Sequence, residues 1–336
     1  MDWNRVALCL IIDGRQSVSN DVQEYLVNDA RIWDPGMLLS SHKGSNVTCH
    51  IFERTVSLSR HSSQGQCFLP LQMLLATKEK PGGKLHSHLW FFSAFARHVQ
   101  PKYCILMEAG VRPRRNALAK FYKEMEMDPS TAICFGQIYP LSPRYYNIAE
   151  SSQMFDYGVT YSLQKPAESF AGYATPYTTG FSSYRWKAIR GEPLNQYFRI
   201  EEEGMASLGP FLSNLYLTVD RIISFETVSK RKRKWKSSYI PSAKADKPVP
   251  STLVSLIAAR RRQVSGTLFG YMYYLKHSMR IWKRSGHSIL RKMILSAHTL
   301  MNVIYILFYW FAPALIYLVV FYVFTTSVAG LGFGTT

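Results

Sequence analysis

Acidic residues and cysteines are both scarce in this chain of 336 residues. Asp and Glu number 22 against 40 Lys and Arg, so the net charge is +18. The five cysteines are Cys9, Cys49, Cys67, Cys104 and Cys134. They form no CxxC pair, which argues against a zinc site and against a disulfide framework. We therefore expect reduced, mostly buried thiols in a cytosolic domain. The positive excess predicts a polyanionic partner or surface: nucleic acid, anionic lipid or a phosphate-bearing substrate.

A long apolar run is absent until the end of the chain. The first apolar run, residues 6–12, stops at Asp13 and is too short to predict a signal peptide. Residues 293–336 contain no Lys, Arg, Asp or Glu. Within them, residues 300–324 are apolar and long enough to cross a hydrocarbon core of about 30 Å. Basic residues crowd the flank before this segment, which predicts that the preceding domain is cytosolic.

Short apolar runs alternate with helical spacing over the first 140 residues, which predicts an α/β fold. The expected strands are 6–12, 47–52, 103–107 and 131–135, with 103–107 in a central parallel position. The stretch that begins at residue 71 is helical or extended, and helices are expected at 88–98 and 117–127. Residues 237–251 contain three prolines and are expected to form a loop. The predicted domains are 1–265, cytosolic; 266–292, a basic amphipathic interfacial helix; and 293–336, transmembrane.

Three acids, Asp13, Glu108 and Asp220, each follow a short apolar run and are candidates for strand ends. Moving a sugar from a nucleoside diphosphate needs acids that hold a divalent metal, cations that stabilise the leaving diphosphate, and a carboxylate base. Each acid fits such a role, but a lone acid after a strand is more often a turn or cap residue. The arginine run at 260–262 could bind a diphosphate, or it could be a solvated or lipid-facing charge run.

Several segments together resemble the chitin synthases, and they occur in the order of that family. They are CLIIDGR (9–15), HIFERT (50–55), KEK (78–80) leading to SHLWFFSAF (87–95), PAESFAGY (166–173), GFSSYR (180–185), DRI (220–222) and RRR (260–262). The resemblance covers about residues 6–266, nearly the whole of the expected cytosolic part.

The resemblance implies a glycosyltransferase-A-like α/β fold with a central mixed sheet flanked by helices, followed by the interfacial and transmembrane helices. It implies UDP-N-acetylglucosamine as donor, a growing β-1,4 chitin chain as acceptor, and Mg²⁺ or Mn²⁺ as cofactor. Membrane lipid is a further expected partner, self-association into a homo-oligomer is left open, and no nucleic acid is expected. The enzyme would lie in the plasma membrane with its catalytic domain in the cytosol.

The resemblance also assigns roles to individual residues. Asp13, Glu53 and Lys78 match donor-pocket positions, Glu108 matches the acid that reaches the metal, and Asp220 matches the general base. We expect these five to converge on one cleft. The acceptor and diphosphate site corresponds to Arg260, Arg261, Arg262 and Gln263.

Departures from the family pattern lie at the positions that carry chemistry. Glu108 stands in place of Asp, Gln137 in place of Glu, and Val219 in place of the acid before the base. The Gln and Trp of the family's Gln-x-x-Arg-Trp motif are Ala259 and Gln263. The alternative function is therefore a catalytically impaired or truncated membrane paralogue that keeps the fold and donor binding only. A nucleic-acid binder is disfavoured, because the basic residues concentrate near the apolar tail and no such motif is present.

Overall fold

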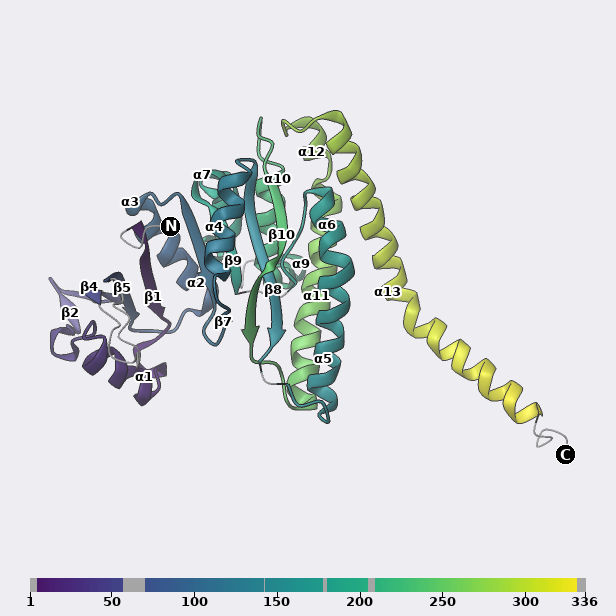
Figure 1. The fold of residues 1–336 in the computed structure, drawn as a ribbon, viewed down its shortest axis with the longest axis horizontal. Coiled ribbons are helices and arrows are strands. Elements are labelled where there is room, and N and C mark those ends of the chain that lie inside the picture. The colour runs from purple at the N-terminus through teal and green to yellow at the C-terminus, as the bar shows by residue number, and fades with distance from the viewer. Residues whose placement is uncertain (1–4, 57–69, 142, 178–179, 205–208, 331–336) are drawn as a thin grey trace. The chain divides into compact units, whose positions relative to one another are not determined.

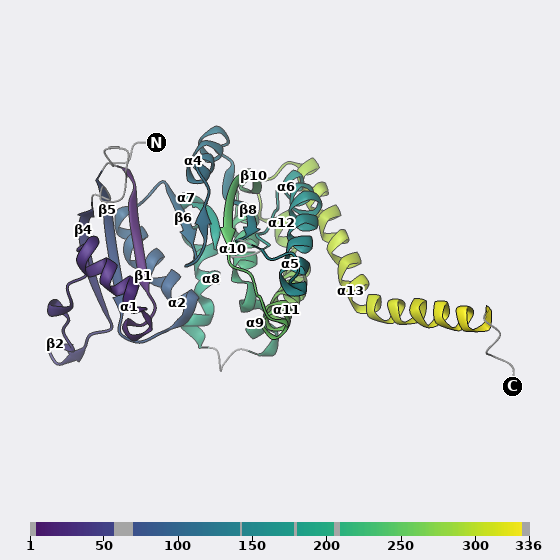
Figure 2. The same ribbon diagram turned by 60° about the horizontal axis from the view of Figure 1, so that its bottom comes forward.

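The computed structural model describes residues 5–56, 70–141, 143–177, 180–204 and 209–330. The chain divides into two compact units, Met1–Cys104 and Ile105–Thr336, and each is described by itself. Figures 1 and 2 show strands and helices alternating through both units. The expected α/β class is therefore confirmed.

Unit 1 is built on a three-stranded sheet in the order β1-β5-β4. Strand β5 runs parallel to β1 and antiparallel to β4. The ambiguous stretch from residue 71 is thus a strand, and Leu75 and Ala76 in it are fully buried, which suits the middle of a sheet. The elements are β1 (Ala7–Ile12), α1 (Asn20–Glu24), β2 (Ser41–His42), β3 (Ser45–Asn46), β4 (Cys49–Val56), β5 (Leu71–Lys78), α2 (Gly83–Trp90) and α3 (Arg97–Val99).

The turn after β1 depends on a glycine. Gly14 has a φ of +97°, and a Cβ there would lie 2.9 Å from Ser17 Oγ and 3.2 Å from Pro81. Both the positive φ and the close approach favour glycine. This turn brings Asp13 beside the segment that follows β5.

Unit 2 is built on a five-stranded sheet in the order β6-β9-β8-β10-β7. Strand β8 pairs antiparallel with β9 and parallel with β10, so the sheet is mixed, as expected. The expected strand at 103–107 has the predicted bounds but lies at one edge of this sheet. The central position expected for it is wrong, because β8 is the strand with a buried run on both faces. The strands are β6 (Tyr103–Met107), β7 (Arg112–Pro113), β8 (Thr131–Pro140), β9 (Phe181–Arg185) and β10 (Lys236–Lys247).

Strand β10 corrects the loop expected at 237–251. It pairs with β8 from Lys236 to Lys247, with an irregularity between Ile240 and Lys244. Pro241 lies within this irregularity, where the ladder does not need its missing N–H. The prolines thus mark a bulge and the end of the strand, not a loop.

Helices pack around the sheet of unit 2 (Figure 1). Two of the longer ones begin with side-chain caps: Asn147 accepts from the Ala149 N–H, and Thr252 forms a reciprocal pair with Ser255. The helices are α4 (Ala117–Met127), α5 (Ile148–Val159), α6 (Lys165–Ala171), α7 (Trp186–Ile189), α8 (Glu192–Glu203), α9 (Pro210–Leu215), α10 (Val219–Val228), α11 (Leu253–His277), α12 (Met279–Lys283) and α13 (Ile289–Gly330).

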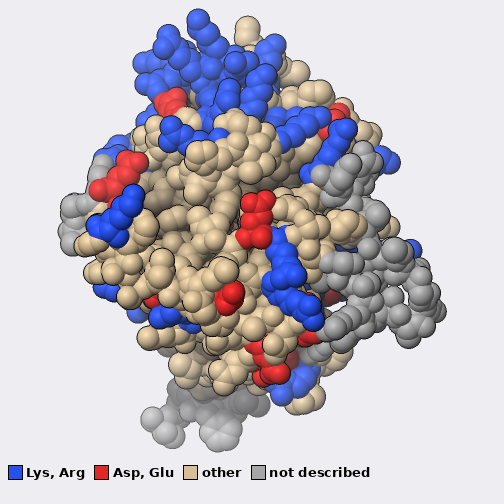
Figure 3. Space-filling view, turned by 90° about the vertical axis from the view of Figure 1, so that its left-hand side faces the viewer, with Lys and Arg blue, Asp and Glu red and all other residues tan. Residues whose placement is uncertain are grey.

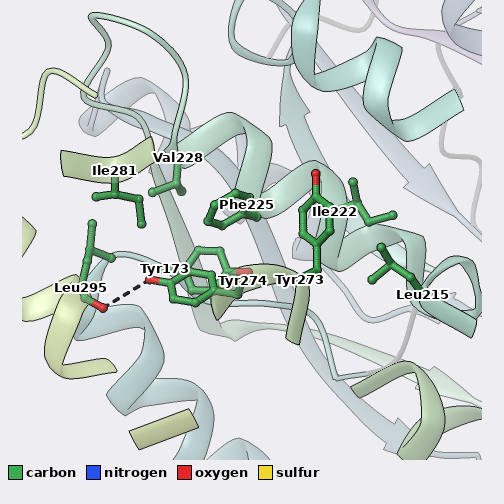
Figure 4. Close-up of a cluster of buried hydrophobic side chains, with 9 residues drawn as sticks. All are labelled: Tyr173, Leu215, Ile222, Phe225, Val228, Tyr273, Tyr274, Ile281 and Leu295. Carbon is green, nitrogen blue, oxygen red and sulfur yellow. Dashed lines mark hydrogen bonds between the residues drawn. The ribbon is translucent and has the colours of Figure 1, made fainter. Parts of the chain in front are cut away.

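An aromatic cluster joins α10, α11 and α13 (Figure 4). Phe225 packs edge-on against Tyr274, with ring centroids 5.1 Å apart, and the Tyr274 hydroxyl donates to the Leu295 carbonyl at 3.3 Å. The stretch 266–292, expected to be one interfacial helix, is divided among α11, α12 and the start of α13. Its tyrosines face the interior, because Tyr273 and Tyr274 are both buried.

Helix α13 is continuous for 42 residues. Its first part packs on unit 2, where Leu295 is 1% exposed and Asn302 is 2% exposed. Residues Ile289–Ala312 are long and apolar enough to cross a membrane by length and composition. Further along, Leu318 and Phe324 are largely exposed, and the helix leaves its neighbours in Figure 2. The expected span at 300–324 is thus not buried in a soluble core.

Leu295→Ala should destabilise the folded chain by about 2 to 4 kcal/mol, because it opens a cavity between α13 and the cluster. Thermal unfolding in detergent, followed by tryptophan fluorescence, measures the effect. Leu290→Ala is the matched control, since Leu290 is 70% exposed in the same helix. Equal effects of the two changes would contradict the packing of α13 on unit 2.

Candidate active site

In unit 1, Asp13 and Lys78 form an ion pair at the carboxyl ends of the parallel strands β1 and β5. Lys78 is 1% exposed and lies 3.1 Å from His86 Nδ1. The two Asp13 carboxylate oxygens accept from the Gly82 and Gly83 N–H groups, each at 2.8 Å. Carboxyl ends of parallel strands are where α/β folds bind ligands. The structure thus brings together two of the three predicted donor residues.

The environment keeps Asp13 ionised. Burial alone would raise its pKa, but the hydrogen bond from Lys78 and those from Gly82 and Gly83 outweigh it, so the pKa lies below its usual value. Asp13 therefore stays ionised through the physiological range and remains available to pair with Lys78.

Glu53 lies farther along the sheet. It faces Leu74 in the β4–β5 ladder, four positions from the Cys49–Lys78 pair, or about 13 Å at the usual rise per residue. Its side chain is exposed and accepts a hydrogen bond from Gln72 at 2.5 Å. Its assignment to the donor pocket remains a prediction.

In unit 2, Glu108 lies just after β6 and is held against a glycine. The Glu108 N–H donates to the Gly180 carbonyl at 3.1 Å, and a Cβ on Gly180 would lie 2.7 Å from the Glu108 carboxyl group. Gly180 has a φ of +105°, which also favours glycine. The GFSSYR segment therefore positions Glu108. The Glu108 carboxylate pairs with Lys247 at 2.7 Å.

Asp220 is 5% exposed in the first turn of α10, and not at a strand end as the sequence suggested. The apolar residues before it belong to helical turns, so a short apolar run alone misplaced it. The pKa of Tyr184 is raised, mainly by burial and then by the charge of Asp220. The Tyr184 hydroxyl is hydrogen-bonded to the Asp220 carboxylate. Burial likewise raises the pKa of Tyr197, with added effects from the charges of Asp220 and Glu108. The charges of both carboxylates thus raise the pKa of the same buried side chain, Tyr197.

The arginine run divides along helix α11. Arg260 and Gln263 are half-buried, whereas Arg261 and Arg262 are exposed, because successive helical residues point about 100° apart. Arg260 forms an ion pair with Asp156 and a 3.1 Å hydrogen bond with Tyr177. The 260–262 cluster expected to bind a diphosphate therefore offers two exposed guanidinium groups, and its first arginine is engaged internally.

Sequence reasoning missed Asp156, Tyr177 and Lys247. Asp156 and Tyr177 hold Arg260, and Tyr177 also hydrogen-bonds Gln263. No motif marks any of the three. Asp156 lies in α5, Tyr177 follows α6 and Lys247 ends β10, so only the packing of these distant segments brings them to their partners. Glu168, in the PAESFAGY segment, forms a buried ion pair with Lys165 at 2.8 Å and accepts from the Thr175 N–H. That segment therefore stabilises the fold around the site.

Comparison with known proteins gives one consistent result. A family model described as the chitin synthase-like glycosyltransferase domain matches residues 1–278. The chain is 35% identical over 324 residues to chitin synthase 1 of Phytophthora sojae, covering 96% of this chain and 35% of that protein. It is 33% identical over 342 residues to chitin synthase 3 of Verticillium dahliae, covering 98% and 38%. The chain thus spans a little over a third of the length of these relatives.

This match, together with the mixed sheet and its flanking helices, defines a glycosyltransferase domain. Its candidate acids lie at strand and helix ends. The chain belongs to the chitin synthase-like glycosyltransferase family. The resemblance drawn from the CLIIDGR, KEK and GFSSYR segments is confirmed.

The divalent metal implied by the family fits poorly at Glu108. No group of three His, Cys, Asp or Glu side chains gathers anywhere among the described residues, so a divalent metal at this position would depend on Glu108 together with phosphate oxygens of a ligand. Lys247 already neutralises the one carboxylate at this position. Among the described residues, a metal at Glu108 would therefore have to share this carboxylate with Lys247.

Asp13→Asn should destabilise the chain by about 1 to 3 kcal/mol at pH 7, because it removes the counter-charge of the buried Lys78; the partial exposure of Asp13 limits the loss. Since the pKa of Asp13 is lowered on folding, its stabilisation is full above the unfolded-state pKa of about 3.9 and disappears as the pH falls through the folded value.

The difference between wild type and Asp13→Asn, measured by thermal unfolding, should therefore be constant from about pH 5 to 7 and shrink below about pH 4. Asp21→Asn, at an exposed acid, is the control and should show no such profile. A difference that grew on acidification would rule out this ion pair.

Proposed function

We propose that this chain binds UDP-N-acetylglucosamine and transfers N-acetylglucosamine to a growing β-1,4 chitin chain. The observation that carries the proposal is the family match over residues 1–278. It is supported by the burial of Asp220, the residue to which the sequence resemblance gives the role of general base. A carboxylate there would accept the proton of the attacking hydroxyl group. The exposed Arg261 and Arg262 would contact the acceptor or the leaving diphosphate.

A second function, donor binding with little polymer synthesis, is favoured by the contacts of the substituted residues. Gln263 replaces a tryptophan and forms a polar network with Arg260 and Tyr177. An amide in such a network offers no flat apolar face to a sugar ring. Glu108, one methylene longer than Asp, is paired with Lys247. Both contacts weaken catalysis without removing Asp13 or Lys78.

Purified membranes containing the chain should bind UDP, release UDP from UDP-N-acetylglucosamine slowly, and form little polymer. Loss of the stacking face costs about 1 kcal/mol, roughly tenfold in acceptor affinity. The triple change Glu108→Asp, Ala259→Gln, Gln263→Trp should raise UDP release more than any single change. Asp220→Asn in the triple background is the control and should abolish release while UDP binding persists. Robust polymerisation by wild type would eliminate the second function, and failure to bind UDP would eliminate both.

We also propose that the chain acts at a membrane, with a basic surface against anionic headgroups. The turn between α10 and β10 lies beside the segment that precedes α13. Arg231 and Ser285 form an isolated antiparallel β-bridge, and the Lys232 N–H donates to the Arg284 carbonyl at 2.9 Å. Figure 3 shows Lys and Arg gathered at this end of the molecule. Ile289 and Leu290, both over two-thirds exposed, follow at once, a combination that suits a bilayer surface. The exposed cations of this surface are Arg231, Lys232, Arg233, Lys234, Lys283 and Arg284.

Arg233→Ala with Lys234→Ala should weaken binding to vesicles containing anionic phosphatidylserine by about thirtyfold, since each of the two cations near the surface contributes about 1 kcal/mol. Flotation of the detergent-solubilised chain with preformed vesicles, at low and high salt, measures this. Arg112→Ala with Arg115→Ala removes two exposed charges outside this surface and should change little. Equal binding to neutral vesicles would count against the headgroup contact.

A further inference from the structure

Lys247 and Glu108 form an ion pair between two strand ends that are 139 residues apart in sequence. The ammonium Nζ lies 2.7 Å from Glu108 Oε2. The two side chains are 23% and 25% exposed, so the pair is reachable from solvent but largely enclosed. The position that the family resemblance gives to a metal-binding acid thus carries a lysine as its partner.

The backbone around Lys247 is fixed on several sides. The Leu141 N–H donates to the Lys247 carbonyl at 2.9 Å, next to the last rung of the β8–β10 ladder. The preceding residue, Asp246, accepts three hydrogen bonds from the Arg114 guanidinium, at 2.7, 3.0 and 3.2 Å. The following residue, Pro248, has its ring within 3.5 Å of the position a Cβ would take on Gly110. The lysine is therefore presented by a fixed strand end.

A divalent cation bound at Glu108 Oε2 would have to share that oxygen with this lysine. Mg²⁺ would bind a carboxylate oxygen at about 2.0 to 2.1 Å. With the ammonium 2.7 Å from Glu108 Oε2, the two cations would be at most about 4.8 Å apart. Repulsion between them in this partly enclosed site favours one cation at a time. Gly180 also closes one side of Glu108, because even a Cβ there would lie 2.7 Å from the carboxyl group.

We propose that the Lys247 ammonium takes the place of a divalent metal at Glu108 and neutralises the diphosphate of a bound nucleoside diphosphate. This proposal rests on the proposed binding of the donor. If Lys247 neutralises the diphosphate, donor binding does not require a metal. A lysine ammonium is a compact point charge that binds phosphate oxygens without a fixed geometry. The ammonium carries one positive charge, whereas Mg²⁺ or Mn²⁺ carries two. It would therefore neutralise the diphosphate less completely, and we expect slow turnover. Glu108 then holds the lysine in position while the donor is absent.

Isothermal titration of UDP into the detergent-solubilised full chain, with EDTA or with excess Mn²⁺, tests the ligand half of this assignment. The dissociation constant should agree within about twofold between the two conditions. Lys247→Ala should weaken UDP binding about tenfold or more, as expected when a charged hydrogen bond to phosphate is lost. Lys247→Arg should restore part of the affinity. Lys244→Ala, in the same strand, is the matched control and should leave binding unchanged.

Electron paramagnetic resonance of Mn²⁺ tests the metal half without UDP. Wild type should not bind Mn²⁺ at this position, Lys247→Ala should gain a weak site, and Lys247→Ala with Glu108→Gln should lose it again. Thermal unfolding of each variant checks that the fold is retained.

A UDP affinity that requires Mn²⁺ in wild type would overturn the assignment, and so would one Mn²⁺ bound equally by wild type and Lys247→Ala. If UDP bound neither with EDTA nor with Mn²⁺, the proposed function itself would fail. The proposed role of Lys247 toward the diphosphate would then fail as well.

Discussion

The parallel pairing of β8 with β10 is the constraint on which the arrangement of unit 2 depends. It joins segments about a hundred residues apart and runs from Lys236–Thr131 to Lys247–Pro140. On its other side β8 pairs with β9, which starts just after the Gly180 carbonyl that binds Glu108. One strand therefore sets both halves of the Glu108–Lys247 pair. Helix α11, which carries the arginine run, begins six residues after β10 ends.

In each of the two units, acids at candidate functional positions are paired with cations. Asp13 contacts Lys78, Glu108 contacts Lys247, and Asp156 contacts Arg260. In a chain of net charge +18, each of these scarce carboxylates thus has a lysine or arginine as its counter-ion. An anionic ligand that bound at any one of these pairs would share or displace its cation. A nucleoside diphosphate fits that requirement because its oxygens can replace a carboxylate as the hydrogen-bond acceptor.

Sequence reasoning predicted the local elements well and the long-range pairings poorly. The strand at 103–107 and the helix at 117–127 have the expected bounds, because apolar period and flanking turns determine them locally. Strand β10 was missed because its prolines indicate a loop, although Pro241 occupies a bulge. Asp220 was placed at a strand end, since a short apolar run does not distinguish strand from helix.

The site shows the same division. Family motifs pointed to Asp13 and Lys78, which form an ion pair. They also pointed to Glu108 and Asp220, whose charges both raise the pKa of the buried Tyr197. Lys247 and Asp156 carry no local signal, because their roles arise only when distant strands and helices pack. The arginine run reads as one cluster in sequence, yet helical geometry separates Arg260 from Arg261 and Arg262.

The central claim is that a lysine stands where the family implies a metal. An experimental structure of the full chain with UDP and excess Mn²⁺, at a resolution that separates a metal from an ammonium group, tests it directly. The account predicts a diphosphate oxygen within about 3 Å of Lys247 Nζ, with Glu108 still paired and no Mn²⁺ between them. Anomalous density for Mn²⁺ bridging Glu108 and the diphosphate, with Lys247 turned away, would contradict it.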